Sequence, residues 1–157
     1  MIRLSRLCDY GIAMMTHLAR DAQGPRSAAD IAEATGVPPA TASKILKLLG
    51  RAGLLASHRG AYGGYGLARP ARAITVAEII EALDGPIALT ACIEEGSGDC
   101  EIERLCPARA NWQRINEAIR RALSEITLAE MATTVPDAFL LPEERALRRD
   151  SESLAAG

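Results

Sequence analysis

Residues 27–53 read SAADIAEATGVPPATASKILKLLGRAG, and this stretch decides the fold. Ser27, with an aspartate three residues later, is typical of a helix N-cap, and Gly36 lies where that helix ends. Pro39 suits the first position of a second helix, which we expect to run to about Arg51. Two helices joined by a tight glycine-bearing turn indicate a helix-turn-helix, although an ordinary helical hairpin has the same local pattern.

In a helix-turn-helix, the second helix enters the major groove of DNA with its N-terminal residues toward the base edges. In this chain those residues are small or polar, which permits a close approach: Pro39, Ala40, Thr41, Ser43 and Lys44. The opposite side of the helix is apolar and is predicted to face the core: Ile45, Leu48 and Leu49.

A short β-hairpin is predicted directly after the second helix, with strands near 54–57 and 65–68. A hairpin in this place forms the wing of a winged helix, and Arg59 at its tip would lie over the minor groove. The glycines between the strands would let the backbone approach phosphates. Glycine-rich loops also bind nucleotides, but this one lacks the Lys-Ser/Thr ending of a P-loop and precedes no strand–helix unit.

The charge distribution favours DNA over a merely solvated basic face. Residues 36–72 contain six lysines or arginines and no acidic residue, whereas the whole chain has 18 basic and 20 acidic residues. A basic surface in an otherwise acidic protein is suited to binding phosphates. We therefore predict contacts with double-stranded operator DNA from Ser27, Pro39, Ala40, Thr41, Ser43, Lys44, Lys47, Arg59, Gly60, Tyr62, Gly63 and Gly64.

Three further helices are predicted from apolar periodicity and capping signals. One spans residues 4–20, and another begins after Thr75, whose partner Glu78 completes a capping box. The third runs from about 107 to 133 with one apolar stripe: Trp112, Ile115, Ile119, Leu123, Ile126 and Met131. So long a stripe exceeds what one small chain can cover, so we expect it to pair with a second copy in a homodimer.

Three of the four cysteines, Cys92, Cys100 and Cys106, lie in one acidic, glycine-bearing stretch. An odd number of thiols does not form a complete disulfide set, and thiols so spaced more often bind metal or carry out redox chemistry. Soft thiolates are preferred by iron–sulfur clusters and by zinc. A structural zinc site needs four closed ligands and no histidine is near, so we favour the cluster and keep zinc as the alternative.

Several function classes are disfavoured. The chain has two histidines and scattered serines and aspartates, which form no catalytic pattern, so we do not expect an enzyme. An electron carrier would use the same thiols but would not need the acid-free basic segment. No apolar run is long enough to span a bilayer, and the first 15 residues lack a signal cleavage site, so we expect a cytoplasmic protein.

The order of these parts resembles the Rrf2 family of winged-helix transcription regulators over about residues 2–134. The resemblance rests on the three spaced cysteines and on LSRLCDYG at 4–11, RGAYGGYGLARP at 59–70 and VAEIIEALDG at 76–85. Residues 80–92, IEALDGPIALTAC, and 98–116, GDCEIERLCPARANWQRIN, are similar to the branch that regulates the SUF iron–sulfur assembly operon. The resemblance implies a homodimer that binds a cluster and an operator, with the cluster's state changing the affinity for DNA.

The resemblance also suggests the cluster ligands. IscR-like members use a histidine three residues after the last cysteine, where this chain has Arg109, whereas NsrR-like members use an N-terminal aspartate of the partner subunit, which Asp9 matches. Adjacent helical residues point about 100° apart, so only one of Asp9 and its neighbour Cys8 should ligate. The implied ligands are Cys92, Cys100, Cys106 and Asp9, with Cys8 as the alternative fourth ligand.

The sequence thus predicts a mainly α, winged helix-turn-helix protein with a β-hairpin wing, a cysteine loop and a long C-terminal dimerisation helix. We assign residues 1–85 to the DNA-binding domain and 86–106 to an iron–sulfur cluster-binding loop, called the cysteine segment. Residues 107–134 form the dimerisation helix and 135–157 a mobile tail. The predicted function is a cluster-sensing transcriptional regulator, with a nitric-oxide- or redox-sensing repressor of the same family as the alternative; the number of irons and the signal stay open.

Overall fold

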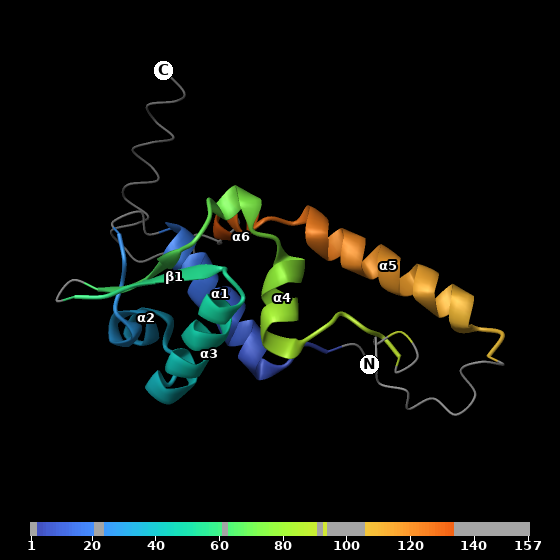
Figure 1. The fold of residues 1–157 in the computed structure, drawn as a ribbon, viewed down its shortest axis with the longest axis horizontal. Coiled ribbons are helices and arrows are strands. Elements are labelled where there is room, and N and C mark those ends of the chain that lie inside the picture. Colours follow the sequence, from blue (N-terminus) through green and yellow to red (C-terminus); the bar gives the residue numbers. More distant parts are fainter. Residues whose placement is uncertain (1–2, 21–23, 61–62, 91–92, 94–105, 134–157) are drawn as a thin grey trace, which may run out of the picture.

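The computed structural model describes residues 3–20, 24–60, 63–90, 93 and 106–133. The elements are α1 (Arg6–Arg20), α2 (Ala28–Thr35), α3 (Pro39–Arg51), β1 (Leu55–His58), β2 (Gly64–Leu67), the 3-10 helix η1 (Ala71–Ala73), α4 (Val76–Asp84), α5 (Arg109–Glu125) and α6 (Leu128–Thr133). Over these residues the chain is mainly helical with one antiparallel pair of strands, which confirms the predicted winged-helix class. Figure 1 shows α1–α4, the strands and α6 gathered in one body, from which α5 extends.

The helix-turn-helix forms where the sequence predicts it. The Ser27 hydroxyl accepts a hydrogen bond from the Asp30 amide at 3.1 Å, and the Asp30 carboxylate accepts one from the Ser27 amide at 3.3 Å. This reciprocal pair satisfies amide groups that the first turn of α2 cannot bond internally. Gly36, with φ 67°, is in the left-handed region and ends α2, and Pro39 is the first residue of α3.

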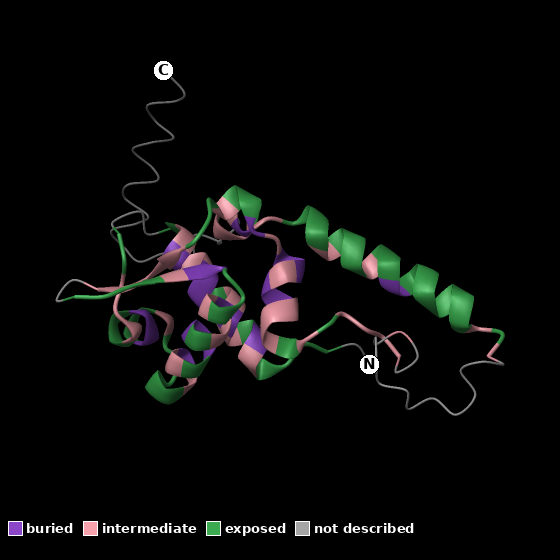
Figure 2. Cartoon of the chain, viewed as in Figure 1, coloured by how far each residue is buried: buried purple, intermediate pink, exposed green. Residues whose placement is uncertain are grey.

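The core is formed by side chains from every helix except α5. Ile31 of α2, Ile45 of α3, Ile79 of α4 and Leu128 of α6 are all fully buried (Figure 2). Each such burial contributes roughly 1.5–3 kcal/mol relative to an exposed side chain. The remaining large members of this cluster are Met14, Met15, Leu18, Leu46, Leu49, Leu54, Leu55 and Ile74.

Two details of the predicted helices are wrong. Leu48 is only half-buried, whereas Leu46 is fully buried, because α3 packs against α1, α2 and α4 at once and its covered face is wider than one stripe. The first helix begins at Arg6 rather than at residue 4, so Leu4 precedes it and is 45% exposed.

The wing pairs with a segment that precedes α2. β1 and β2 are antiparallel, with Leu55 opposite Leu67, and each strand is shifted by one residue from its predicted position. Arg26 extends this pairing: its amide donates to the Tyr65 carbonyl at 3.0 Å, and the Tyr65 amide donates back at 2.7 Å. A Cβ at Gly64 would clash with the Arg26 carbonyl, so this approach requires glycine.

The long C-terminal helix is divided, and the prediction of one helix over 107–133 is wrong. Thr127 precedes α6 and forms another capping box: its hydroxyl accepts from the Glu130 amide at 3.2 Å, and the Glu130 carboxylate accepts from the Thr127 amide at 2.7 Å. The Leu128 amide donates to the Ile74 carbonyl at 2.8 Å, and the Val76 amide to the Ile126 carbonyl at 2.9 Å. The chain therefore turns back after α5, and α6 packs on α1 and η1.

The start of α1 is fastened to the end of α4. Asp84 accepts two hydrogen bonds from Ser5, one from its hydroxyl and one from its amide at 3.0 Å, and the Ser5 hydroxyl accepts from the Cys8 amide at 3.1 Å. Nearby, Gly11 lies so close to Leu83 that a side chain there would clash. Within the described ranges, no helix is long and apolar enough to cross a membrane.

Candidate functional site

α3 presents half of the residues predicted to meet DNA, together with Arg51, which was not among them. Ala40, Lys44, Lys47 and Arg51 are exposed and share one face of the helix at spacings of four, three and four residues. Pro39 is exposed as well, and Thr41 and Ser43 are half-buried along the edge of this face. We call Ala40, Lys44, Lys47 and Arg51 the α3 face.

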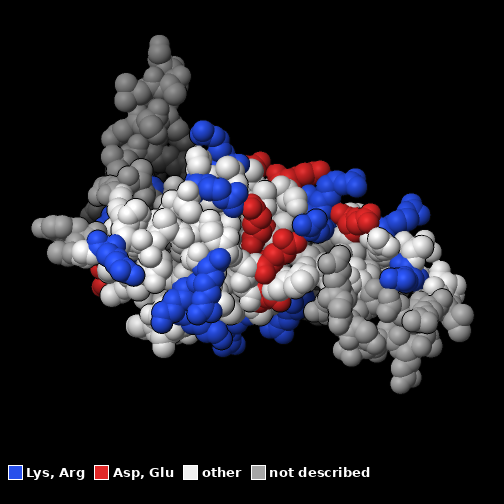
Figure 3. Space-filling model, viewed as in Figure 1, with Lys and Arg blue, Asp and Glu red and all other residues white. Residues whose placement is uncertain are grey.

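The α3 face is positively charged and lies apart from the carboxylates of the body. α3 contains no acidic residue, and in the part of the chain that the structure describes neither Lys44 nor Lys47 forms an ion pair. Figure 3 shows basic side chains gathered over α3 and acidic ones nearer to α4. Glu78 and Glu81 of α4 are instead paired with Arg69 and Arg120. The charge of the α3 face is thus available to an external anion.

In the wing, fewer of the predicted DNA contacts are exposed. Arg59 and Gly60 are exposed at the end of the hairpin, whereas Tyr62 lies outside the described residues. Gly63 and Gly64 are half-buried, and a Cβ at Gly63 would clash with the His58 carbonyl. The hairpin's own geometry therefore explains these glycines. The Ser27 hydroxyl, also predicted to contact DNA, accepts the cap hydrogen bond of α2.

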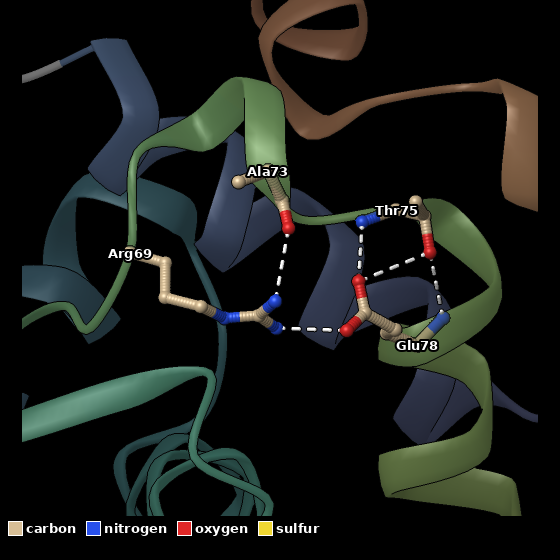
Figure 4. A network of polar contacts seen from close by, with 4 residues as sticks. All are labelled: Arg69, Ala73, Thr75 and Glu78. Atoms are coloured by element: carbon tan, nitrogen blue, oxygen red, sulfur yellow. Dashed lines mark hydrogen bonds and ion pairs between the residues drawn. The ribbon is translucent and has the colours of Figure 1, made fainter.

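A polar network ties the chain that leaves the wing to the start of α4 (Figure 4). Arg69 donates to the Ala73 carbonyl at 3.0 Å and to one oxygen of Glu78 at 2.8 Å. The other oxygen of Glu78 accepts from the amide of Thr75 at 2.9 Å and from its hydroxyl at 3.1 Å. Burial alone would raise the pKa of Glu78, but the bonds from Arg69 and Thr75 and the charge of Arg69 outweigh it and lower the pKa below 4.5.

Arg69→Ala is expected to raise the pKa of Glu78 and to destabilise the fold modestly. Both side chains are more than a third exposed, so solvent screening limits the loss to about 0.5 kcal/mol at neutral pH. Because the folded pKa of Glu78 is depressed, this stabilisation is present above about pH 4.5 and is lost as the pH falls through the folded pKa. Urea unfolding of Arg69→Ala and of the control Arg72→Ala, at pH 7 and in acid, measures it; an equal loss at both pH values would contradict the assignment.

The structure describes only some of the predicted cluster ligands. Cys106 is half-buried just before α5, and Asp9 is exposed on α1, whereas Cys92 and Cys100 fall outside the described residues. Among the residues described, no three His, Cys, Asp or Glu side chains come together as a metal site. Asp9 lies in an open hollow that it shares with Arg3, Leu4, Ser5, Arg6 and Asp84.

Cys8 has a different environment from Asp9, although the two are neighbours. Its side chain is fully buried and packs with Val76 and Ile80. Burial, followed by the negative charges of Asp84 and Asp9, raises the pKa of the Cys8 thiol to about 11. To bind an external metal, the Cys8 side chain would have to leave this packing, whereas Asp9 is already exposed.

The two ends of α5 differ in how far they are covered. Toward its C-terminal end, Leu123 packs against the apolar cluster of α4, and the Arg120 guanidinium pairs with Glu81 at 2.9 Å. Toward its N-terminal end, Trp112 and Ile115 are 40% and 45% exposed, although both are large and apolar. Among the described parts of the chain, nothing buries these two side chains, and Figure 2 shows most of α5 as exposed.

Sequence reasoning missed Asn116, the one buried polar side chain among the residues that the structure describes. Its amide nitrogen donates to the Ile87 carbonyl at 2.8 Å, and its amide oxygen accepts from the Leu89 amide at 3.1 Å. These bonds attach the beginning of the cysteine segment to α5. The partners lie 27 and 29 residues away, so no local pattern could have pointed to them.

Comparison with known proteins gives one consistent result. Residues 4–134 match the family model of Rrf2, described as an iron-dependent transcriptional regulator. The transcriptional regulator IscR of Klebsiella pneumoniae is 33% identical over 131 residues, covering 83% of this chain and 79% of that protein.

Solved structures agree with this match. CymR, the global cysteine regulator of B. subtilis, superposes with a TM-score of 0.68 at 34% identity, covering 87% of this chain and all of that one. IscR of T. potens superposes with a TM-score of 0.65 at 31% identity, covering 89% of this chain and 93% of that one.

Proposed function

The chain belongs to the Rrf2 family of transcriptional regulators, and from this premise we propose that it is an iron–sulfur cluster sensor that binds operator DNA as a homodimer. We further propose that it controls SUF iron–sulfur assembly genes, as the sequence resemblance suggests. Its relatives are regulators rather than enzymes. The observation that carries the proposal is the position of the cysteine segment, which leaves α4 after Asp84 and enters α5 at Arg109. It therefore joins the DNA-binding body to the exposed helix.

The DNA-binding role is supported by the α3 face and by the start of α3. The first turn of α3 has no side-chain cap, and Pro39 has no amide hydrogen to satisfy. Uncapped amides and the helix dipole favour a phosphate at this end. Lys44 and Lys47 follow on the same face, where the phosphates of a duplex would lie if α3 enters the major groove.

Lys44→Ala and Lys47→Ala are each expected to weaken binding to every duplex and to make it less dependent on salt. Each lysine that neutralises one phosphate adds about 0.9 to the slope of log affinity against log salt concentration. Titrations by fluorescence anisotropy between about 50 and 200 mM salt measure the slope; a protein with about six to ten phosphate contacts loses about 10³ to 10⁵ in affinity over this range. Arg114→Ala on exposed α5 is the control; a slope that falls equally with Arg114→Ala would contradict the assignment of α3.

The donors in the chain fit an iron–sulfur cluster by their chemistry. Cys106 is accessible as a thiolate ligand, and three thiolates from Cys92, Cys100 and Cys106 suit such a cluster. Asp9 is exposed on the outside of α1 and can be offered to a second copy, whereas the Cys8 thiol is buried with a raised pKa. This contrast favours Asp9 as the fourth ligand. When bound, such a cluster would supply an iron that reacts with oxygen or nitric oxide.

The exposed apolar face of α5 supports the homodimer. Trp112 and Ile115 would leave water if the α5 helices of two copies paired, and the area removed from water stabilises the pair. A two-fold dimer carries two α3 helices, which match two half-sites of an operator.

The test of the proposed function is anaerobic purification followed by analysis of iron and acid-labile sulfide. We expect a coloured protein that contains both, and a different affinity of the cluster-loaded and apo forms for an operator selected from a random duplex pool. Protein without iron and sulfide would overturn the proposal, and colourless protein containing zinc would favour the zinc alternative.

The signal is a separate question. CymR of B. subtilis, which is 34% identical to this chain, is named the global cysteine regulator. Proteins with a similar fold therefore do not all respond to the same signal. A second candidate is therefore a nitric-oxide- or redox-sensing repressor. Exposing the cluster-loaded protein separately to oxygen, to nitric oxide and to an iron chelator, and then measuring operator affinity, distinguishes the signals.

A further inference from the structure

Asn116 is buried on a helix whose other residues are exposed or only half-buried. It is 7% exposed, and it is the sole buried residue of α5. A buried amide without partners is costly, and here both of its polar atoms are satisfied by backbone groups of one short stretch, residues 87–89. This side chain therefore holds residues 87–89 in a defined place on the helix.

The two hydrogen bonds of Asn116 lie close to the thiols in the sequence. Leu89 precedes Cys92 by three residues, and Cys106 precedes the first residue of α5 by three. The Arg109 amide, at the start of that helix, donates to the Cys106 carbonyl at 3.4 Å. The beginning and the end of the cysteine segment are thus both attached to α5.

We propose that Asn116 is the positioning residue of the cysteine segment: it fixes residues 87–89 against α5, and so limits the conformations open to the thiols that follow them in the sequence. The inference rests on the proposed function, since it concerns ligands of the cluster. Asn116 itself is no ligand. Its effect is to restrict the conformations from which the thiols must assemble, and conformational entropy is a main cost of closing such a loop.

The chemistry of the side chain explains why an asparagine serves this purpose. One amide group provides a donor for the Ile87 carbonyl and an acceptor for the Leu89 amide, and it carries no charge that would need a counterion when buried. Alanine would make neither hydrogen bond. Leucine would fill a similar volume and also make neither, so it separates hydrogen bonding from packing.

The test measures how fast the cluster is lost. Purified, cluster-loaded dimer is mixed with an iron chelator under nitrogen, and the decay of visible absorbance is followed. Asn116→Ala and Asn116→Leu are expected to lose the cluster about tenfold faster than wild type, the lower end of the effect that supporting residues have on metal sites. Asn111→Ala, an exposed asparagine of the same helix, is the matched control and should decay at the wild-type rate.

A second measurement uses the apoprotein and does not depend on the cluster. Hydrogen exchange at the Leu89 amide should be faster in both Asn116 variants, while the thermal midpoint of the body stays close to that of Asn111→Ala. Wild-type decay in Asn116→Leu would overturn the proposal even if exchange at Leu89 became faster. Wild-type protein lacking iron and sulfide would instead refute the proposed function, and this inference with it.

Discussion

Cys106→Ala is expected to leave the protein without its cluster. Cys106 is the one predicted thiolate whose place the structure describes, at the start of α5, and two remaining thiolates are too few to hold an iron–sulfur core. Iron and sulfide content should fall to background, at least about tenfold below wild type. The fold of the body should persist, because Cys106 contributes nothing to the core clusters. Iron and sulfide analysis with circular dichroism measures both.

Cys8→Ala is the matched control for this prediction. It removes a buried sulfur and should cost about 1 kcal/mol of stability, as small core truncations do. It should nevertheless retain the cluster, since the Cys8 side chain is fully buried against Val76 and Ile80 and would have to leave the core to reach an iron. Loss of the cluster from Cys8→Ala with retention in Asp9→Ala would show that the fourth ligand is wrongly assigned.

Ile115→Asp is expected to convert the proposed dimer into monomers. The side chain is 45% exposed in the single chain, and an aspartate there would be buried without a partner when a second copy covers the face. Such a buried charge costs about 3 kcal/mol or more, which corresponds to more than about a hundredfold in the dissociation constant of the dimer. A monomer has one α3 helix, so operator affinity should fall by about a hundredfold or more.

Gln113→Asp is the control for this second prediction. It introduces the same side chain on the same helix, but at a position about 160° around the axis from Ile115. It should remain dimeric in sedimentation velocity and bind the operator as wild type does. A dimer that survives Ile115→Asp with unchanged operator affinity would mean that the copies associate through another surface.

The helices of the DNA-binding part could be predicted because their signals are local. The capping boxes at Ser27 and Thr75 each need residues three apart, and Pro39 marks the start of α3 by its own covalent geometry. The structure confirms all three. The same kind of signal was present at Thr127 and Glu130, but the continuing apolar stripe obscured it, and the predicted helix ran on through it.

The features that the sequence did not predict depend on contacts between parts of the chain that lie far apart in the sequence. The bonds of Asn116 to residues 87–89, the pairing of Arg26 with Tyr65, and the attachment of Ser5 to Asp84 join segments that no sequence period relates. Burial of Leu46 likewise follows from three helices meeting α3 at once. The proposed cluster site is also of this kind, because bringing Asp9 to the thiols would need tertiary contacts and, in the proposed dimer, a second copy.

The way the chain leaves α5 has a mechanical consequence. Backbone bonds between Val76 and Ile126 and between Ile74 and Leu128 pin the C-terminal end of that helix to the body, while its other end adjoins Cys106. Seventeen residues make a rod about 25 Å long. A tilt of about 10° around the pinned end would therefore carry the far tip through about 4 Å, comparable to one helical turn. In the proposed sensor, α5 would therefore convert a small rotation near Ile126 into a larger displacement of the chain next to Cys106.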